Sequence, residues 1–195
     1  LRRGGRGEFR EGAVREQVVF EDTFRGPLQQ LGPEGGVVRQ RRRDVGGDAL
    51  MNVVSDSFYT SQGNEFYYVE PKEDEITPAQ KMWLRNHLNA FERALHGADF
   101  KDPAKGYAAY IDVDSFIDHH IIVELTKNID GFRFSTFFQK DRGGKIKLEP
   151  IWDWNLSYGN ANGKQGQMAE HWYWPQLDDR QYSYYRRLFE DPDFG

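Results

Sequence analysis

Apolar residues recur at helical spacing between residues 78 and 96. The repeat consists of Leu84, Leu88, Phe91 and Leu95. These positions lie three or four residues apart, so they share one face of a helix. Thr77 can cap the free amides of a helix start, Pro78 suits the first turn, and Gln80 completes a capping box. Gly97 is a typical helix stop. The pattern predicts a capped helix whose apolar stripe belongs to the core.

A second helix is predicted to begin at Asp114. Its inward positions would be Phe116, Ile117, His120, Ile121 and Leu125. The pair His119-His120 invites a metal interpretation, but adjacent side chains point about 100° apart on a helix and cannot easily share one ion. His120 is therefore expected in the core. Glu124 lies on the same helix, and it either faces a functional site or is an exposed or paired glutamate.

Two further parts of the chain have the composition of strands. Residues 66–69, Phe-Tyr-Tyr-Val, predict a strand that ends at Glu70-Pro71. Residues 128–140 and 145–155 predict the two arms of one β-hairpin. The first arm is rich in aromatic and β-branched residues, and Gly143-Gly144 between the arms is a strong turn signal.

The open end of this predicted hairpin carries the candidate chemistry. With the turn centred on Arg142-Gly143, Asp130 and Asp153 emerge together on neighbouring strands about 5 Å apart. Asn128 and Asn155 lie beside them. Two carboxylates with amides nearby suit a divalent-cation site or an acid–base site. The plainer interpretation is that Asp130 begins a turn and Asp153 caps the next loop.

Composition is that of one globular domain. The 195 residues are 38% apolar and 15% aromatic, so burial relies on Phe, Tyr and Trp. The net charge of −5 gives no support for nucleic-acid binding or for attraction to an anionic membrane. The sequence has no run of about 18 apolar residues, so we expect no transmembrane segment. Without cysteine the chain has no disulfide framework.

The first part of the chain differs from the rest. Residues 1–48 hold ten of the twenty glycines and no lysine, a composition typical of irregular or mobile structure. Within it, Val18-Val-Phe20 and Val37-Val38 are candidate short strands. The basic run 39–43 either binds phosphate or is a solvated charged turn, and the Asp44 that follows at once favours the turn.

Several separate motifs follow one another between residues 66 and 175. They are Glu70-Pro-Lys-Glu73 with Ile76-Thr77 and Gln80, Asp112-Val-Asp-Ser-Phe-Ile-Asp118, Glu124-Leu-Thr-Lys-Asn128, Asp130-Gly131, Ser135-Thr-Phe137, Gly144-Lys145, Pro150-Ile-Trp-Asp153 and Tyr158-Gly-Asn160. In this order they resemble the CotH kinase family, the atypical protein kinases related to spore coat protein H. The combination is far more specific than a lone Asp-Gly pair.

The resemblance implies an α+β, atypical protein-kinase-like fold, mostly its C-terminal lobe with a catalytic β-hairpin. In such a lobe one aspartate before the hairpin orients or deprotonates the acceptor hydroxyl, and a second one after it holds Mg²⁺ on the nucleotide phosphates. By resemblance Asp130 is the catalytic aspartate and Asp153 the metal ligand. Asn128 and Asn155 would bind the cofactor, with Asn155 also a metal ligand.

The implied reaction transfers the γ-phosphate of ATP to serine or threonine hydroxyls of a coat or surface protein, with Mg²⁺ or Mn²⁺ as the metal. The implied partners are therefore a nucleotide and a protein substrate. The family also suggests a spore-coat, secreted or envelope-associated location.

Two features depart from the family pattern. The motif after the hairpin usually reads Trp-Asp-aromatic-Asp, and Asn155 replaces its last aspartate; an amide ligand without formal charge predicts weaker or altered metal binding. Kinase-like enzymes also use a glycine-rich loop and an N-lobe lysine, whereas the first lysine here is Lys72. We therefore expect a truncated N-lobe, with residues 1–57 its irregular remnant or a linker. Residues 58–195 would be the C-lobe, truncated at its C-terminus.

Two other classes of function stay open. A non-catalytic kinase-like scaffold or adhesin module is favoured by Asn155 and the missing N-lobe, and opposed by the retention of Asp130 and Asp153. A metal-dependent phosphohydrolase would use the same aspartates with water as the nucleophile. No histidine or lysine that could stabilise a leaving group is evident near the pair.

The C-terminal part of the sequence is strongly aromatic. The segment His171-Trp-Tyr-Trp174 either packs under the site or lines a substrate groove, and its density favours packing. Residues 182–189 predict another helix, with Tyr185, Leu188 and Phe189 on its apolar side. We interpret Asp193-Phe-Gly195 as a coincidental match to the kinase metal motif.

Overall fold

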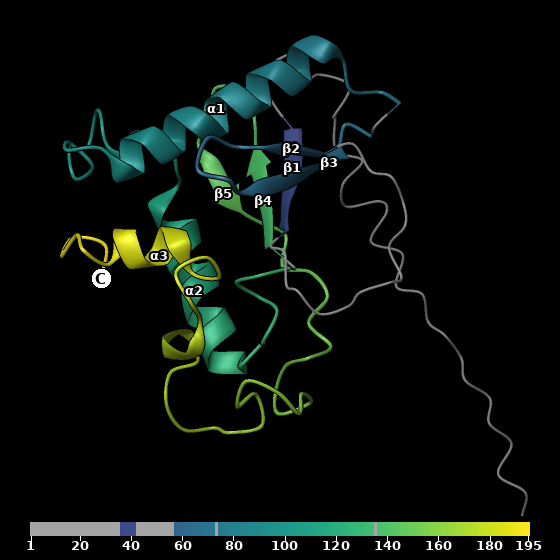
Figure 1. Ribbon diagram of the computed structural model, residues 1–195, viewed down its shortest axis with the longest axis vertical. Coiled ribbons are helices and arrows are strands. Elements are labelled where there is room, and N and C mark those ends of the chain that lie inside the picture. Colours follow the sequence, from purple (N-terminus) through teal and green to yellow (C-terminus); the bar gives the residue numbers. More distant parts are fainter. Residues whose placement is uncertain (1–35, 42–56, 73, 135) are drawn as a thin grey trace, which may run out of the picture. The chain divides into compact units, whose positions relative to one another are not determined.

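The computed structural model describes residues 36–41, 57–72, 74–134 and 136–195 (Figure 1). Every described residue belongs to one compact unit, Leu31–Gly195. The predicted strand at Val18-Val-Phe20 lies outside the described residues.

One antiparallel sheet organises this unit. Its strands are β1 Gly36–Arg41, β2 Ser57–Tyr59, β3 Glu65–Glu70, β4 Thr136–Lys140 and β5 Ile146–Leu148, in the order β2-β3-β1-β4-β5. The strands predicted at residues 66–69 and at Val37-Val38 are confirmed. Arg39–Arg41 belong to the central strand β1, so a charged turn there is wrong, and residues 42 and 43 lie outside the described residues.

The β4–β5 hairpin is shorter than predicted. Its register pairs Phe138 with Leu148 and Lys140 with Ile146, and Gly144 donates its N–H to the Asp141 carbonyl across the turn (3.1 Å). The ladder ends at Leu148, two residues before Pro150, which has no N–H to donate. Asp130 and Asp153 therefore lie on no strand, and the expectation that the ladder sets them about 5 Å apart is wrong.

Helix α1, Pro78–His96, forms as the sequence predicts. Thr77 Oγ1 accepts the Gln80 N–H at 3.3 Å, and Gln80 Oε1 accepts the Thr77 N–H at 2.9 Å, which completes the capping box. Gly97 is the C-cap. The predicted stripe is buried in the core.

Helix α2, Val113–Thr126, begins one residue earlier than predicted, and Asp112 caps it by accepting the Ser115 N–H at 3.1 Å. Its buried side chains are Phe116, His119, His120, Val123, Glu124 and Thr126. His120 is buried as expected. Ile121 and Leu125 were expected inside but are 55% and 73% exposed. Polar side chains such as His119 and Glu124 point inward instead, because they have hydrogen-bond partners in the C-terminal part of the chain.

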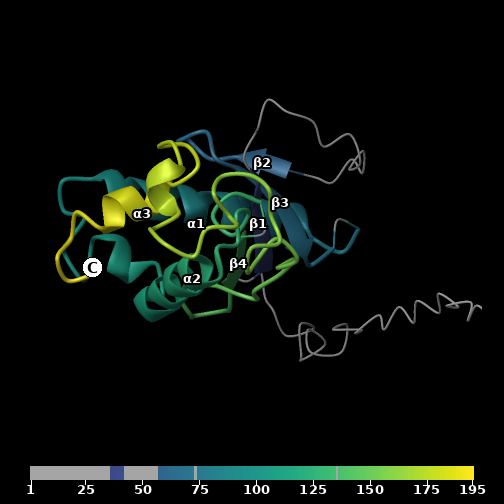
Figure 2. The same cartoon turned by 90° about the horizontal axis from the view of Figure 1, so that it is seen from below.

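The remaining elements are short. They are the 3₁₀ turns η3 Tyr107–Ala109 and η4 Trp174–Gln176, and helix α3 Ser183–Leu188. Helix α3 lies beside α1 and α2 (Figures 1 and 2), where the Tyr184 hydroxyl donates to Glu92 and the Tyr185 hydroxyl to the Phe116 carbonyl. Tyr185 and Leu188 are buried as predicted, whereas Phe189 is 42% exposed just beyond the helix.

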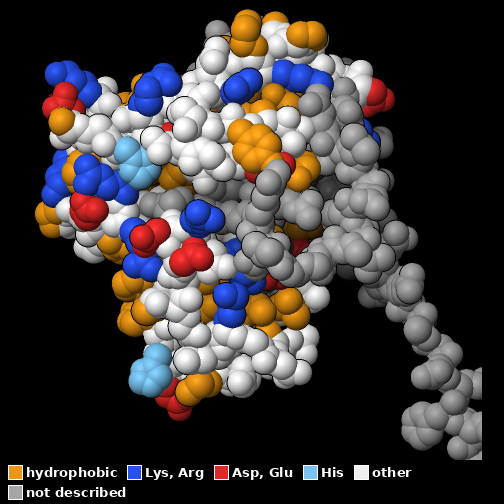
Figure 3. All heavy atoms as spheres, viewed as in Figure 1, with side chains coloured by type: hydrophobic (Ala, Val, Ile, Leu, Met, Phe, Trp, Pro, Cys, Tyr) orange, Lys and Arg blue, Asp and Glu red, His pale blue; other side chains and the backbone are white. Residues whose placement is uncertain are grey.

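All strand pairs of the described sheet are antiparallel, and no helix in this part of the chain links two parallel strands, so the structure is consistent with the predicted α+β class. Charged side chains of both signs are interspersed on the face in Figure 3 rather than gathered in one block. Among the described residues, no helix has the length and apolarity to cross a bilayer.

Candidate active site

The loop that carries Asp130 is set by the end of helix α2. Lys127 adopts a left-handed conformation (φ 53°), and its N–H bonds back to Glu124 and Val123. Asn128, fully buried, accepts the Asp130 N–H on Oδ1 at 3.1 Å, the geometry of an Asx turn. Asp130 therefore does begin a local turn, as the plainer interpretation held, and the turn fixes its place relative to α2.

Gly131 brings this loop against helix α2. A Cβ at this position would lie 2.6 Å from Cγ2 of the fully buried Val123, closer than side chains approach in real structures. The Thr136 hydroxyl donates to the Gly131 carbonyl at 2.8 Å and ties the loop to the start of β4. The glycine of the Asp-Gly pair is thus explained by close packing.

The Asp130 carboxylate is paired with Arg133. The distance from Arg133 Nη2 to Asp130 Oδ1 is 2.9 Å, and the arginine is only 5% exposed. Arg133 Nε also donates to the Ile129 carbonyl at 3.0 Å, and its guanidinium lies over the Phe134 ring. Sequence reasoning missed Arg133, although an Asp–Arg pair three residues apart in a turn is a local signal. Such a pair orients the carboxylate and balances its charge.

Asp153 and Asn155 lie on an exposed irregular segment after β5. Asp153 has a left-handed backbone (φ 58°), and its side chain is exposed. Asn160 Nδ2 donates to the Asn155 carbonyl at 2.7 Å, which closes the following loop. Left-handed non-glycine residues in the described chain all fall between residues 127 and 171, and such backbone conformations concentrate at functional sites.

Contacts outside the hairpin bring the two motif segments together. The Tyr158 N–H donates to the Thr126 carbonyl, the last residue of α2, at 2.7 Å. Gly166 packs so closely on Ile129 that a Cβ would lie 2.7 Å from Ile129 Cγ2. The loop that follows Asp153 therefore lies against the loop that carries Asp130.

A third segment is held by Glu124. Its Oε2 accepts the Tyr173 N–H at 2.6 Å and its Oε1 accepts the Trp174 N–H at 2.8 Å. Burial raises the pKa of the Glu124 carboxyl, which these two bonds and Lys127 offset in part. Of the predicted aromatic segment, Tyr173 is 1% exposed and Trp172 is 61% exposed. Tyr173 therefore packs under the candidate site, and its hydroxyl donates to the Ile129 carbonyl.

Comparison with known proteins identifies the family of the chain. A family model described as CotH kinase protein matches residues 44–195, more than half of the chain. The chain belongs to the CotH kinase family. No curated protein and no solved structure matches it. The resemblance stated from the sequence motifs is thereby confirmed, and membership suggests a kinase-like enzyme.

The oxygen donors of this CotH kinase chain suit a metal that is shared with a nucleotide. Mg²⁺ in such sites binds one or two protein side chains and the substrate phosphates, unlike an all-protein cage. Asp153 and Asn155 offer two exposed side chains of this kind. Among the described residues, no group of three His, Cys, Asp or Glu side chains could hold a metal by itself. Asn128 already uses its side-chain oxygen on the Asp130 amide.

Some of the buried polar atoms without hydrogen-bond partners lie in the same two segments, and others lie on helices α1 and α3. Within the described part of the chain they include Asn128 Nδ2, Trp154 Nε1 and Ser157 Oγ. Each can donate a hydrogen bond, and buried donors in native proteins nearly always have an acceptor. For Asn128 this favours a role as a donor to a phosphate or water oxygen over a role as a metal ligand.

The two histidines of α2 belong to the core of this family member. His119 Nδ1 is 3.0 Å from the Tyr185 hydroxyl, and His120 bonds to the Tyr182 hydroxyl. Burial lowers the pKa of His119 to about 3 and that of His120 to about 4. Both rings lie among aromatic side chains, which supports the core interpretation.

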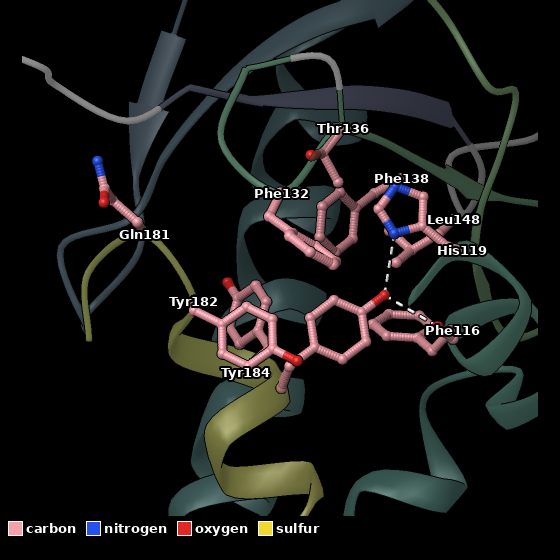
Figure 4. Close-up of a pocket in the computed structure, with 10 residues that line it drawn as sticks. Phe116, His119, Phe132, Thr136, Phe138, Leu148, Gln181, Tyr182 and Tyr184 are labelled. Carbon is pink, nitrogen blue, oxygen red and sulfur yellow. Dashed lines mark hydrogen bonds between the residues drawn. The ribbon is translucent and has the colours of Figure 1, made fainter. Parts of the chain in front are cut away.

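A small cavity lies among these aromatic residues (Figure 4). It is lined by Phe116, His119, Phe132, Thr136, Phe138, Leu148, Gln181, Tyr182, Tyr184 and Tyr185. Its volume of about 20 Å³ is enough for one water molecule. A nucleotide needs a cleft at least ten times larger, so this cavity is part of the core and not the nucleotide site.

Proposed function

We propose that this chain is a metal-dependent protein kinase that transfers the γ-phosphate of ATP to serine or threonine hydroxyls of a coat or surface protein. The observation that supports this best is the joining of the two motif segments. Within a CotH kinase domain, the loops of Asp130 and Asp153 lie against each other through Tyr158 and Gly166.

Each residue has a distinct task in this proposal. Asp130 accepts a hydrogen bond from the substrate hydroxyl and receives its proton as the hydroxyl oxygen bonds to the γ-phosphorus. The bond from phosphorus to the β–γ bridging oxygen breaks, and ADP leaves. Asp153 and Asn155 hold Mg²⁺ or Mn²⁺, which neutralises charge on the phosphates when bound. Asn128 donates to an oxygen near Asp130.

The test uses isosteric variants of the purified full-length protein. We would incubate it with γ-labelled ATP, Mg²⁺ or Mn²⁺ and a serine-rich acceptor, beside Asp130→Asn and Asp153→Asn. Loss of a positioned base lowers kcat about 10²- to 10⁴-fold, so Asp130→Asn should lose transfer. Asp153→Asn should lose transfer as well, because it weakens binding of the metal that neutralises the phosphates. Asp118→Asn is a matched control, because Asp118 is exposed on helix α2 outside these loops. Absence of both transfer and metal-dependent nucleotide binding in the unaltered chain would contradict the proposal.

A second candidate is a non-catalytic kinase-like scaffold. Two observations favour it: Asn155 replaces an aspartate of the family motif, and Arg133 already engages the Asp130 carboxylate. A scaffold predicts that the unaltered chain and all three variants behave alike in the transfer assay. Transfer that Asp130→Asn removes and Asp118→Asn preserves excludes this reading.

A further inference from the structure

Tyr173 reaches the loop of Asp130 from far along the chain. Its side chain is 1% exposed, and its hydroxyl donates to the Ile129 carbonyl at 2.5 Å over a separation of 44 residues. The Phe132 ring stacks parallel to the Tyr173 ring, with centroids 6.1 Å apart. The aromatic ring thus packs on one side of this loop while its hydroxyl bonds to the loop backbone.

Tyr173 and Arg133 share their partners. The Ile129 carbonyl accepts from the Tyr173 hydroxyl and also from Arg133 Nε. Burial raises the pKa of the Tyr173 hydroxyl, and the nearby Arg133 charge offsets this rise in part. A guanidinium donates in a rigid planar fork, so fixing one edge also fixes the direction of the other. Nη2 of the same rigid group holds Asp130 Oδ1 at 2.9 Å.

Tyr173 is itself held in place from helix α2. Glu124 accepts the successive N–H groups of Tyr173 and Trp174 with its two carboxylate oxygens. Lys127 Nζ lies 3.8 Å from Glu124 Oε2 and bonds to the His171 carbonyl. The backbone and the side chain of Tyr173 are therefore both held by hydrogen bonds. A residue that is itself fixed in this way can fix the position of another residue.

We propose that Tyr173 is a positioning residue for Asp130 and that it acts through Arg133. Its hydroxyl fixes the guanidinium, and the guanidinium fixes the carboxylate in the direction from which it meets the acceptor hydroxyl. This inference rests on the proposed kinase function, because it assigns Asp130 the role given there. This role requires no contact between the buried Tyr173 side chain and nucleotide or acceptor.

The central variant is Tyr173→Phe, which removes the hydroxyl and keeps the ring. Small displacements of a catalytic group lower the rate strongly, so we expect kcat to fall about 10- to 100-fold. The KM for ATP should stay within about twofold, since the residues that bind nucleotide are untouched. Glu124→Gln should act in the same direction, because a carbamoyl NH₂ would face one of the two backbone N–H groups.

Tyr182→Phe is the matched control. It removes another buried hydroxyl of the same aromatic core, but that hydroxyl bonds to His120 and not to the Asp130 loop. It should lower stability to a similar degree while leaving kcat unchanged. Equal losses of kcat in Tyr173→Phe and Tyr182→Phe would overturn the inference in favour of a general loss of stability.

A double variant separates positioning from folding. In an Asp130→Asn background the group to be positioned is absent, so Tyr173→Phe should lower the residual rate no further. Additive losses would overturn the inference. An inactive unaltered chain would instead overturn the proposed function, and with it the catalytic role of Tyr173. Transfer by the unaltered chain together with an unchanged kcat in Tyr173→Phe would overturn the inference alone.

Discussion

The packing of Gly131 against helix α2 gives a prediction that needs no assumption about activity. In Gly131→Ala the new Cβ would lie 2.6 Å from Val123 Cγ2 and 2.9 Å from Cγ1. Val123 is fully buried, so its side chain has no free direction in which to move. Overpacking of this kind destabilises a fold by about 1–3 kcal/mol. That loss is a large part of a typical free energy of unfolding of about 5–15 kcal/mol.

The partner substitution Val123→Ala tests the cause of that loss. Alone it removes two buried methyl groups and should cost about 1.5–3 kcal/mol. In the double variant the alanine at 131 fills space that the valine has vacated. The two losses should therefore combine to less than their sum, with an interaction energy of about 1–2 kcal/mol.

Urea unfolding followed by tryptophan fluorescence measures these free energies. Gly144→Ala is the control, because a Cβ there meets its nearest neighbour, Asp141 Cβ, at an ordinary 3.5 Å. It should change stability by less than about 0.5 kcal/mol. A Gly131→Ala variant as stable as the unaltered chain, or strictly additive losses in the double variant, would refute the packing argument.

Three further predictions concern pH, capping and metal binding. The pKa values of His119 and His120 are lowered in the folded chain, so the unfolded chain binds protons more readily than the folded chain does. The free energy of unfolding should therefore fall as the pH drops below about 6.5, by up to about 1.4 kcal/mol per pH unit for each histidine. Glu124, whose pKa is raised, opposes this fall in part; urea midpoints at pH 7 and pH 5 measure the net effect, and His120→Gln should flatten it. Thr77→Ala should cost about 1 kcal/mol of unfolding free energy through loss of the N-cap, and Thr77→Ser should retain it. Asn155→Asp should tighten Mg²⁺ binding in the presence of ATP, and an unchanged affinity by calorimetry would count against Asn155 as a ligand.

Local signals in the sequence were sufficient for helix α1. The N-cap, the first-turn proline and the capping glutamine lie within one turn of each other, and the C-cap glycine directly follows the last residue of the helix. None of these signals depends on a distant contact. The strand at Val37-Val38 was also found from its composition. Its place in the sheet was not, because β1 pairs with β4 about a hundred residues later and nothing local encodes that pairing.

The errors in α2 and in the hairpin have one physical origin. An apolar stripe was expected to face inward on α2. Polar side chains can be buried in its place when each of them has a hydrogen-bond partner. The hairpin was expected to reach Asp130 and Asp153. The buried Asn128 side chain instead bonds the Asp130 amide, so the chain turns before β4 begins. Side-chain bonds to nearby backbone compete with a ladder.

Residues that act across the chain were the hardest to find from the sequence. Tyr173 lay inside an aromatic segment for which packing was expected, and of this segment only Tyr173 is buried, whereas His171 and Trp172 are exposed. Its bond to Ile129 depends on the path of the chain between the two residues. No spacing rule predicts such a contact. Asp130, Asp153, Asn128 and Asn155 remain predictions drawn from the family motifs.

The last turn of α2 contacts all three segments of the candidate site, and its inward polar groups make two of these contacts. Val123 receives Gly131 of the Asp130 loop, Glu124 holds the segment of Tyr173, and the Thr126 carbonyl accepts the Tyr158 N–H from the loop after Asp153. One turn of helix thus anchors all three segments of the candidate site. Residues that position one site as a unit do not contribute additively. We therefore expect each single substitution in this turn to lower kcat by nearly as much as a combination of substitutions does.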